Sequence, residues 1–479
     1  MSDCCNPVDR PQDKKYDLIV VGGGSAGFSA AITAAEQGAQ VAVIGTGTIG
    51  GTCVNVGCVP SKALIRAVES IHHANAAPMR FKGIEARARA ADWGQVIAEK
   101  DALVSGLRQA KYADLLPLYN NVAYHEGTAR LVDNGVEAGG RRFTADRIVI
   151  ATGTRPAVPA IPGLPDVDAL DSTTALDLTE LPKSMIVLGG GYVGVELAQT
   201  FSRAGVDVTL VFRSRLLPEM EPEIGAALTD YLSSEGITVL GNLAYQSVHK
   251  TAEGGAALTV LRDGVAEIIV AERLLLATGR APNVEDLGLI EAGVKQTLSG
   301  AIIVDDHMRT SVRGVYAAGD VTGRDQFVYM AAYGAKIAAK NALNGDSLRY
   351  DNSAMPSVVF SDPQVASVGF TEAQAIAAGY AARTSTLPLE NVPRALAARD
   401  TRGLIKLVAD GRTRKLLGAH ILAPEGADSI QTAAMALRCG LTIDDLVETI
   451  FPYLTTVEGL KLAAQAFDRD VNRLSCCAG

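Results

Sequence analysis

The sequence lacks the features that would place the protein in a membrane, on a nucleic acid or outside the cell. No apolar run approaches the ~18 residues of a membrane span, and the polar N-terminal stretch MSDCCNPVDRPQDKKYD has no apolar core of a signal peptide. Basic residues form no stripe, and 44 of them stand against 53 acidic residues for a net charge of −9. We therefore expect a cytoplasmic protein that acts on a small molecule, with neither nucleic acid nor membrane as partner.

Cysteine is also scarce. Seven cysteines in 479 residues are too few for a secreted disulfide scaffold. Six of them fall in pairs, at Cys4 and Cys5, Cys53 and Cys58, and Cys476 and Cys477. This grouping indicates redox or metal chemistry. Cys439 stands alone in the helical pattern AAMALRCGLT and is expected to be a buried core thiol.

An internal repeat organises the first half of the chain. YDLIVVGGGSAGFSAAITAAEQGAQVAVI, from Tyr16, aligns without a gap with KSMIVLGGGYVGVELAQTFSRAGVDVTLV, from Lys183. Both copies predict a strand, a tight glycine turn, a helix and a second strand. The G-x-G-x-x-G pattern falls at Gly22, Gly24 and Gly27 and again at Gly189, Gly191 and Gly194. Two such patterns between an apolar strand and an alanine-rich helix predict two Rossmann-like dinucleotide-binding domains, rather than ordinary glycine-rich turns.

Three further predicted strands end in glycine or aspartate. They read RIVIATG up to Gly153, RLLLATGR through Gly279, and GVYAAGD up to Asp320. Asp320 stands at the carboxyl end of a strand, where open α/β sheets bind ligands, although it could equally be the N-cap of the next helix. After Tyr350 the pattern alternates between polar and apolar residues before amphipathic helical segments, which predicts a C-terminal α+β domain.

The pair Cys53 and Cys58 lies just beyond the first glycine-rich loop. Pro60 suits the first turn of a helix that opens near Cys58. A thiolate at a helix N-terminus has a lowered pKa, so one of the two sulfurs should be reactive. The alternative is a purely structural disulfide between the two cysteines. A disulfide that closes so short a loop removes little conformational entropy from the unfolded chain and so stabilises the fold little. The spacing favours a redox pair.

Together these motifs resemble a known family. GGTCVNVGCVPSK, the duplicated glycine pattern, ATGR and AAGD are similar to the FAD-dependent pyridine nucleotide-disulfide oxidoreductases, and the resemblance covers residues 16 to 470. Within that family, FPYLTTVEGLKLAAQAFDRDVNRLSCCAG resembles the mercury-reducing branch, including its terminal Cys-Cys-Ala-Gly.

The resemblance implies an architecture and two cofactors. FAD and NADPH are the expected cofactors, with Hg(II) bound to small-molecule thiols as the substrate. A homodimer is implied, in which the C-terminal domain of one subunit closes the active site of the other. The expected divisions are a tail at 1–15, an FAD-binding domain at 16–180 and 276–349, an NADPH-binding domain at 181–275, and a dimerisation domain at 350–479.

Residue roles also follow from the resemblance. Lys62 and Glu196 match an ion pair beside the flavin, Tyr192 matches an aromatic gate over the nicotinamide, and Asp320 matches a flavin contact. Cys58 corresponds to the sulfur nearer the flavin and Cys53 to the more exposed one, so electrons would pass from NADPH through FAD to this pair. Further cofactor contacts are expected at Gly51, Thr52, Gly153 and Gly279.

The C-terminal stretch departs from the disulfide-reducing members of the family. They carry a His-Pro-Thr-x-x-Glu motif whose histidine protonates the departing thiolate, whereas this chain has Tyr453 at the matching place. A phenol is a poor proton shuttle at neutral pH, but reduction of Hg(II) needs none. A packing role is the alternative for Tyr453. Cys476 and Cys477 are expected to carry Hg(II) from the partner subunit to Cys53 and Cys58 by ligand exchange, all four thiols binding the metal in turn.

Two strand ends carry information about the nucleotides. In the second repeat, Arg213 and Arg215 stand where an NAD enzyme would place a carboxylate, which favours the 2′-phosphate of NADPH over a role as solvated surface residues. In the first repeat Gly45 replaces the acid that usually binds the adenosine ribose. The ribose contact must then come from elsewhere or be lost.

Three functions compete on this sequence. The leading one is NADPH-dependent reduction of Hg(II) to Hg(0), a mercury-detoxifying activity. The second is reduction of an organic disulfide, which Tyr453 and the terminal cysteines disfavour. The third is sequestration of the metal without turnover, which leaves both nucleotide folds without a use.

Overall fold

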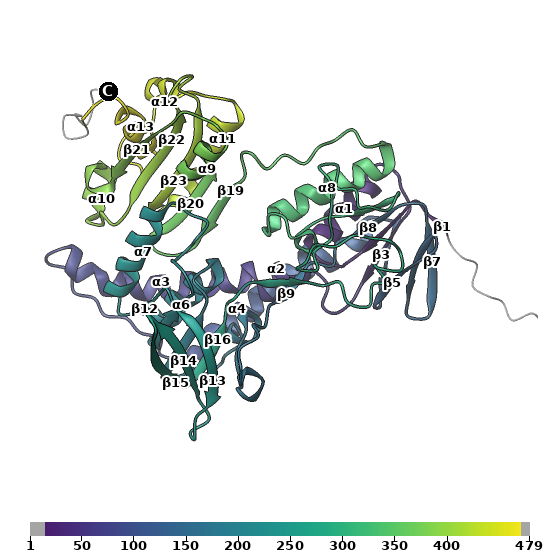
Figure 1. The fold of residues 1–479 in the computed structure, drawn as a ribbon, viewed down its shortest axis with the longest axis horizontal. Helices are drawn as coiled ribbons and strands as arrows, with labels where there is room; N and C mark the ends of the chain where they lie inside the picture. The colour runs from purple at the N-terminus through teal and green to yellow at the C-terminus, as the bar shows by residue number, and fades with distance from the viewer. Residues whose placement is uncertain (1–14, 471–479) are drawn as a thin grey trace, which may run out of the picture. The chain divides into compact units, whose positions relative to one another are not determined.

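The computed structural model of the chain describes residues 15–470 (Figure 1). Contacts group these residues into two compact units, each assembled from three stretches of the chain. The first comprises the residues up to Pro60, Asp101–Arg155 and Arg280–Tyr350, and the second comprises Ser61–Lys100, Pro156–Gly279 and the residues from Asp351 onward. The division into separate FAD, NADPH and dimerisation domains at the boundaries given above stays a prediction.

A five-stranded parallel sheet forms the centre of the first unit. Its strands, in spatial order, are β18 (Val315–Ala317), β8 (Ile148–Ile150), β2 (Leu18–Val21), β3 (Val41–Gly45) and β4 (Val122–Glu126). The inner strands are buried along their whole length, because a parallel sheet is covered on both faces. Helices α1 (Ser25–Ala35) and α8 (Val328–Asn344) pack against each other, as Figure 1 shows, through alanine-rich buried faces.

A second sheet of the first unit is mostly antiparallel. It contains β1 (Lys15–Tyr16), β7 (Arg141–Ala145), β6 (Gly135–Ala138) and β5 (Ala129–Val132). Its apolar side chains share one buried cluster with those of the parallel sheet. The first unit therefore has a core of its own.

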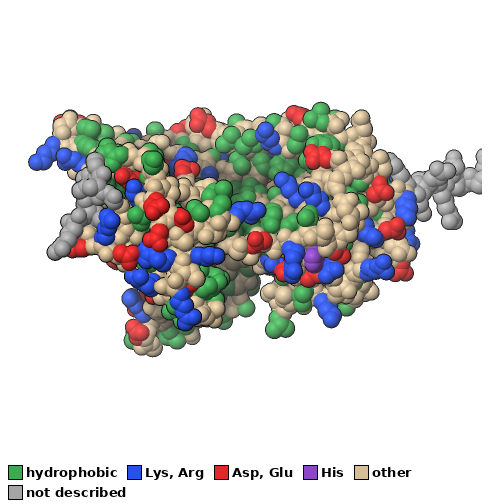
Figure 2. All heavy atoms as spheres, turned by 90° about the horizontal axis from the view of Figure 1, so that it is seen from above, with side chains coloured by type: hydrophobic (Ala, Val, Ile, Leu, Met, Phe, Trp, Pro, Cys, Tyr) green, Lys and Arg blue, Asp and Glu red, His purple; other side chains and the backbone are tan. Residues whose placement is uncertain are grey.

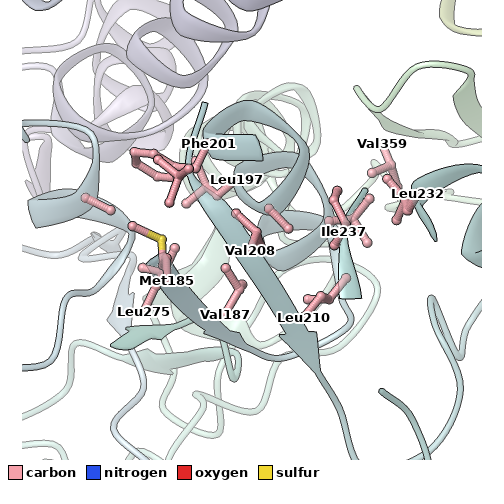
Figure 3. Packing of buried hydrophobic residues seen from close by; sticks show 14 of the residues in the cluster. Met185, Val187, Leu197, Phe201, Val208, Leu210, Leu232, Ile237, Leu275 and Val359 are labelled. Carbon is pink, nitrogen blue, oxygen red and sulfur yellow. The ribbon is translucent and has the colours of Figure 1, made fainter. Parts of the chain in front are cut away.

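The second copy of the repeat builds the parallel sheet of the second unit. Its strands are β12 (Thr238–Leu240), β11 (Asp207–Val211), β10 (Ser184–Leu188) and β16 (Arg273–Leu276), and helices α6 (Tyr192–Ala204) and α7 (Pro222–Ser234) follow β10 and β11 in the chain. Figure 3 shows the core, in which Phe201 and Leu197 of α6 face strand residues such as Val208. Phe201 is fully buried, and replacing such a ring by Ala typically costs about 3–5 kcal/mol of stability.

The C-terminal part of the second unit is a five-stranded antiparallel sheet with helices. The strands are β19 (Pro356–Val359), β20 (Gln364–Gly369), β23 (Leu416–Ala423), β22 (Leu404–Asp410) and β21 (Ala382–Pro388). Helices α11 (Gly426–Arg438) and α13 (Glu458–Gln465) pack on it. The two Rossmann-like folds and the C-terminal α+β region confirm the fold class that the sequence predicts.

One expectation about the core is wrong. Cys439 is exposed, because it caps the end of α11 and precedes the left-handed turn at Gly440, where the chain leaves the packed face of the helix. The helical pattern around it gave the correct element but not the face on which its last residue lies.

Several further elements complete the described chain. They are α2 (Gly51–Val56), α3 (Cys58–Arg80), α4 (Trp93–Arg108), α5 (Ser172–Ala175), α9 (Glu372–Ala377), α10 (Pro393–Ala398), α12 (Ile443–Glu448), β9 (Thr154–Pro156), β13 (Ala244–Lys250), β14 (Ala256–Arg262), β15 (Val265–Ala271) and β17 (Arg280–Pro282). Within residues 15–470, no helix combines the length and the hydropathy needed to cross a membrane. On the face drawn in Figure 2, basic and acidic side chains are interspersed.

Candidate active site

The first glycine-rich loop is a surface of bare backbone at a helix N-terminus. Gly22 has a φ of +126°, and a Cβ there would lie 2.2 Å from the carbonyl oxygen of Ala151. A Cβ at Gly27 would lie 1.9 Å from the carbonyl oxygen of Gly22. Gly24 caps α1, and a Cβ at Gly51 would approach its Cα to 2.6 Å. Because side chains are excluded and the N-terminal amides of α1 face outward, the loop fits the pyrophosphate of a dinucleotide such as FAD.

The cysteine pair follows this loop on two consecutive helices. Cys53 lies in the first turn of α2, Gly57 breaks that helix, and Cys58 is the first residue of α3, as the sequence predicts. Both cysteines are partly exposed. The Asn55 side chain between them donates to the carbonyl oxygens of Ile49 and Gly51, at 2.9 Å each, and so ties the pair to the segment that precedes α2. The dipole of α3 favours a thiolate at Cys58.

Tyr112 is a neighbour of the pair that the sequence did not reveal. It lies in a π-helical turn at Gln109–Ala113, its hydroxyl is 3.1 Å from the Ser25 hydroxyl, and its ring meets that of Phe28 edge-on. Burial raises the pKa of Tyr112, and the charges of Cys53 and Cys58 raise it further against the opposing hydrogen bond with Ser25. Tyr112 is therefore a protonated phenol, and a Cβ at Gly50, the N-cap of α2, would lie 3.2 Å from its ring. No motif marks it, because π-turns have no short sequence signal.

Lys62 and Glu196 meet as the resemblance implies. The Lys62 Nζ donates to Glu196 Oε2 at 2.6 Å, and the backbone N–H of Phe360 donates to Glu196 Oε1 at 2.9 Å. The side chain of Glu196 is only 7% exposed, whereas that of Lys62 is 32% exposed. Lys62 also stands over the Phe360 ring, 4.9 Å from its centroid. The pair ties the second turn of α3 to α6, although its role beside a flavin stays a prediction.

Asp320 lies three residues after the end of β18, at the carboxyl end of the parallel sheet. Its Oδ2 accepts a hydrogen bond from the Thr154 hydroxyl at 3.0 Å, and Arg280 Nε lies 4.0 Å away. Burial raises the pKa of Asp320, and both neighbours oppose that shift. The alternative of a helix N-cap is wrong, because Gly319 is the cap and the Asp320 side chain faces Thr154. Gly153, which precedes Thr154, has a φ of +69°.

The second glycine-rich loop repeats the geometry of the first. Gly189 also has a φ of +126°, and a Cβ at Gly194 would lie 1.8 Å from its carbonyl oxygen. Gly191 caps α6, and Tyr192 is the first helical residue. Burial raises the pKa of Tyr192, and a hydrogen bond with Ser357 opposes this. Gly279, with a φ of +110°, has open space where a side chain would stand.

The two arginines after β11 have different environments. Arg215 donates to the carbonyl oxygens of Pro218 and Met220, the latter at 2.7 Å, and so holds its own loop. Arg213 is exposed, and its charge partly offsets the burial that raises the pKa of Tyr245 to about 12. Arg213 is thus the better placed of the two to meet an anionic group.

Of the C-terminal candidate residues, the structure describes Tyr453 but not the two terminal cysteines. Tyr453 is 50% exposed, and the Leu454 N–H that follows it donates to Glu458 Oε2 at 3.2 Å. Burial raises the pKa of Glu458. Cys476 and Cys477, like Cys4 and Cys5, lie outside residues 15–470. Within that range, no three His, Cys, Asp or Glu side chains converge into a metal site.

Two histidines belong to a buried ion-pair network in the second unit. The carboxylate of Asp362 lies 3.0 Å from the guanidinium of Arg203 and 3.2 Å from that of Arg402. His72 and His73 approach the same carboxylate. Burial, then the charge of Arg203, lowers the pKa of His72 from 6.5 to about 4. Burial thus keeps His72 neutral at physiological pH, although the carboxylates of Glu235 and Asp362 raise its pKa.

Comparisons with known proteins agree with this geometry. The profile of the pyridine nucleotide-disulphide oxidoreductase family matches residues 16–337, and that of the family's dimerisation domain matches residues 355–464. The chain is 46% identical to the mercuric reductase of Lysinibacillus sphaericus, over 98% of this chain and 85% of that protein. It is 48% identical to the mercuric reductase of Streptomyces lividans, over 97% of this chain and 98% of that protein.

A solved structure has the same fold. The HOCl-induced flavoprotein disulfide reductase RclA from Escherichia coli superposes with a TM-score of 0.82 at 29% identity, over 94% of this chain and 99% of that chain. A Cu(II) complex of the same protein gives a TM-score of 0.83. The fold is thus shared with a flavoprotein that reduces disulfides, while identities above 40% occur with mercuric reductases.

Proposed function

We propose that this chain, which belongs to the pyridine nucleotide-disulphide oxidoreductase family, uses NADPH and FAD to reduce Hg(II) to Hg(0) at Cys53 and Cys58. The observation that carries the proposal is the identity of 41–48% with seven mercuric reductases over nearly the whole chain. The geometry supports it, because two partly exposed cysteines follow a glycine-rich loop that fits a dinucleotide.

The residues have separate tasks in this reaction. FAD, when bound, would supply the two-electron step between NADPH and the cysteine pair, because no side chain of the protein accepts a hydride. Cys53 and Cys58 bind Hg(II) through their thiolates, and the Hg–S bonds break as two electrons reduce the metal to Hg(0). Overall, NADPH loses a hydride, Hg(II) gains its two electrons, and one proton is released to solvent. Tyr112, a neutral phenol packed beside the start of α2, can orient the metal without adding a negative charge.

Delivery and dimer formation are finer parts of the proposal. Cys476 and Cys477 of one subunit pass Hg(II) by thiolate exchange to Cys53 and Cys58 of the other, so the metal is never released as a free ion. The match to a dimerisation domain at residues 355–464 supports a homodimer. Tyr453, exposed in that domain, needs to carry no proton, because the reaction cleaves no organic disulfide whose departing thiolate must be protonated.

The nucleotide preference follows from the second glycine-rich loop. Arg213 binds the 2′-phosphate of NADPH, while Arg215 shapes the loop through Pro218 and Met220. The proposal thus gives the two arginines different roles, whereas the sequence predicted that both bind the 2′-phosphate. Reduction of an organic disulfide is the second candidate, favoured by the fold shared with a disulfide reductase at 29% identity.

A substrate comparison tests the proposal. NADPH oxidation by the FAD-loaded enzyme is measured with HgCl₂ in excess thiol, with oxidised glutathione and with oxidised lipoamide. We expect turnover with mercury alone. Turnover with an organic disulfide and none with mercury would support the second candidate, and metal binding without NADPH oxidation would support sequestration. A mixed dimer of a Cys53→Ala, Cys58→Ala subunit with a Cys476→Ala, Cys477→Ala subunit tests delivery between subunits, because one complete site remains.

A further inference from the structure

The end of β3 lacks the acid that dinucleotide-binding folds use to hold the adenosine ribose. Gly45 is the last residue of β3, the position that such folds give to an aspartate or glutamate. A Cβ at Gly45 would lie 2.3 Å from the hydroxyl oxygen of Tyr124. A Cβ at Gly23, in the glycine-rich loop, would lie 2.8 Å from the same oxygen. The Tyr124 phenol therefore fills the space between the loop and the end of β3, so no acid fits at Gly45 while Tyr124 is present.

Tyr124 is held in this place as a neutral hydroxyl. Its ring is partly buried and tilts against Phe28 of α1, with centroids 6.5 Å apart. Burial raises the pKa of Tyr124, and the charge of Glu126 raises it further. Across the described part of the chain, no protein group is hydrogen-bonded to the Tyr124 hydroxyl. The hydroxyl can therefore donate to, and accept from, a ligand at the strand ends.

Glu126 supplies a carboxylate one strand away from the missing acid. β4 pairs in parallel with β3, and Glu126 is the direct partner of Gly45. The Gly127 N–H donates to the Gly45 carbonyl oxygen at 2.8 Å, which keeps the two strand ends level. Tyr124 and Glu126 are two residues apart and so point to the same face of the sheet, the face on which Tyr124 meets Gly45 and Gly23. Glu126 is exposed, and no side chain of residues 15–470 forms an ion pair with it.

We propose that Glu126 and Tyr124 bind the adenosine ribose of FAD in place of an acid at Gly45. The Glu126 carboxylate accepts hydrogen bonds from the ribose hydroxyls, and the Tyr124 hydroxyl completes the contact beside the glycine-rich loop. The ribose-binding acid has thus moved from the end of β3 to the same level of β4, a shift of one strand spacing, about 4.8 Å. This inference rests on the proposed flavin-dependent function, but it concerns cofactor affinity and not the reaction.

The test measures binding of FAD to the flavin-free protein by the quenching of flavin fluorescence, without NADPH or mercury. Glu126→Gln keeps the size of the side chain and removes its charge. Because a hydrogen bond to a charged group is lost, the dissociation constant for FAD should rise about 10- to 100-fold. Glu137→Gln, which removes an equally exposed charge from β6, is the matched control and should leave affinity unchanged. Tyr124→Phe should weaken binding by a smaller factor.

An FAD analogue that lacks the 2′-hydroxyl of the adenosine ribose identifies the group recognised. Wild type should bind this analogue more weakly than FAD, whereas Glu126→Gln should bind the two with similar affinity. Adding Gly45→Glu to the Tyr124→Ala, Glu126→Gln protein should recover tight binding of FAD, because the space at Gly45 is then open.

Two results would overturn the inference. One is wild-type affinity for FAD in Glu126→Gln, and the other is an equal loss in Glu137→Gln, which would indicate a general charge effect. Either result leaves the proposed function standing. A wild-type protein that binds FAD but does not reduce Hg(II) would instead overturn the proposed function and leave the ribose site intact.

Discussion

The Lys62–Glu196 ion pair gives the most quantitative prediction about stability. Lys62→Met removes the charge but keeps a side chain that can cover the Phe360 ring. Glu196, 7% exposed, is then left with a buried negative charge and one hydrogen bond from the Phe360 N–H. Glu196→Gln still accepts that hydrogen bond, and Lys62, 32% exposed, can turn to water. Lys62→Met should therefore destabilise the protein more than Glu196→Gln does.

The size of the effect follows from burial and distance. Opposite charges about 4 Å apart attract by about 4 kcal/mol at an effective dielectric constant of about 20. Desolvation of Glu196 and solvent screening at Lys62 offset part of this, which places the pair between an exposed one, worth about 0–1 kcal/mol, and a buried one, worth about 3–5 kcal/mol. We expect a loss of about 2–3 kcal/mol for Lys62→Met, about 1–2 kcal/mol for Glu196→Gln, and a coupling energy of about 2 kcal/mol.

Urea unfolding of the two single variants and the double variant, followed by far-UV circular dichroism, measures these free energies. The double variant should lose less stability than the sum of the single variants. Additive losses within about 0.5 kcal/mol would show that the two side chains do not interact, and a greater loss in Glu196→Gln than in Lys62→Met would show that burial of Glu196 does not set the size of the effect.

Four further predictions concern the site and its surroundings. Replacing Cys53 or Cys58 by Ala should abolish mercury-dependent NADPH oxidation and leave FAD bound, because the glycine-rich loop that fits the cofactor is built from other residues. Tyr112→Phe should lower kcat for thiol-bound Hg(II) by about 10-fold, since one hydrogen-bonding group near the start of α2 is lost. Arg213→Glu should raise KM for NADPH and reduce the preference for NADPH over NADH. The pKa of His72 in the folded state is depressed to about 4, so its neutral form contributes stability at pH 7 that is lost as the pH falls from 6.5 to 4. This loss is worth about 3 kcal/mol. In His72→Gln, the free energy of unfolding should fall less over the same pH range.

For each of these four variants, a different outcome would contradict the expected role of the residue. Loss of flavin from the cysteine variants would indicate a structural role for the pair. Unchanged turnover in Tyr112→Phe would leave that tyrosine with packing alone. Arg215→Ala is the matched control for Arg213→Glu, since it should disturb the loop and affect both nucleotides similarly. Equal acid sensitivity of the wild type and His72→Gln would show that other groups of the Asp362 network control unfolding.

The sequence predicted those features that depend on backbone constraints. Both glycine-rich loops have the expected geometry, because only glycine permits a φ of +126° at Gly22 and Gly189. The start of α3 at Cys58 was also predictable, since Gly57 and Pro60 frame it. These signals are local in the chain and need no tertiary information.

Features that depend on contacts between distant segments were not predictable from local patterns. Tyr112 reaches the start of α2 from a π-helical turn, and Tyr124 fills the space at Gly45 from a neighbouring strand. Lys62 and Glu196 were paired only through the resemblance to a family. The prediction that Cys439 is buried was wrong, because the end of α11 is set by the turn that follows it.

The most direct test of the central claim is the amount of Hg(0) vapour formed per NADPH oxidised, with HgCl₂ supplied in excess thiol under anaerobic conditions. We expect one Hg(0) for each NADPH in the wild type and none in the Cys53→Ala, Cys58→Ala variant. NADPH oxidation without Hg(0), or equal Hg(0) formation by that variant, would contradict it.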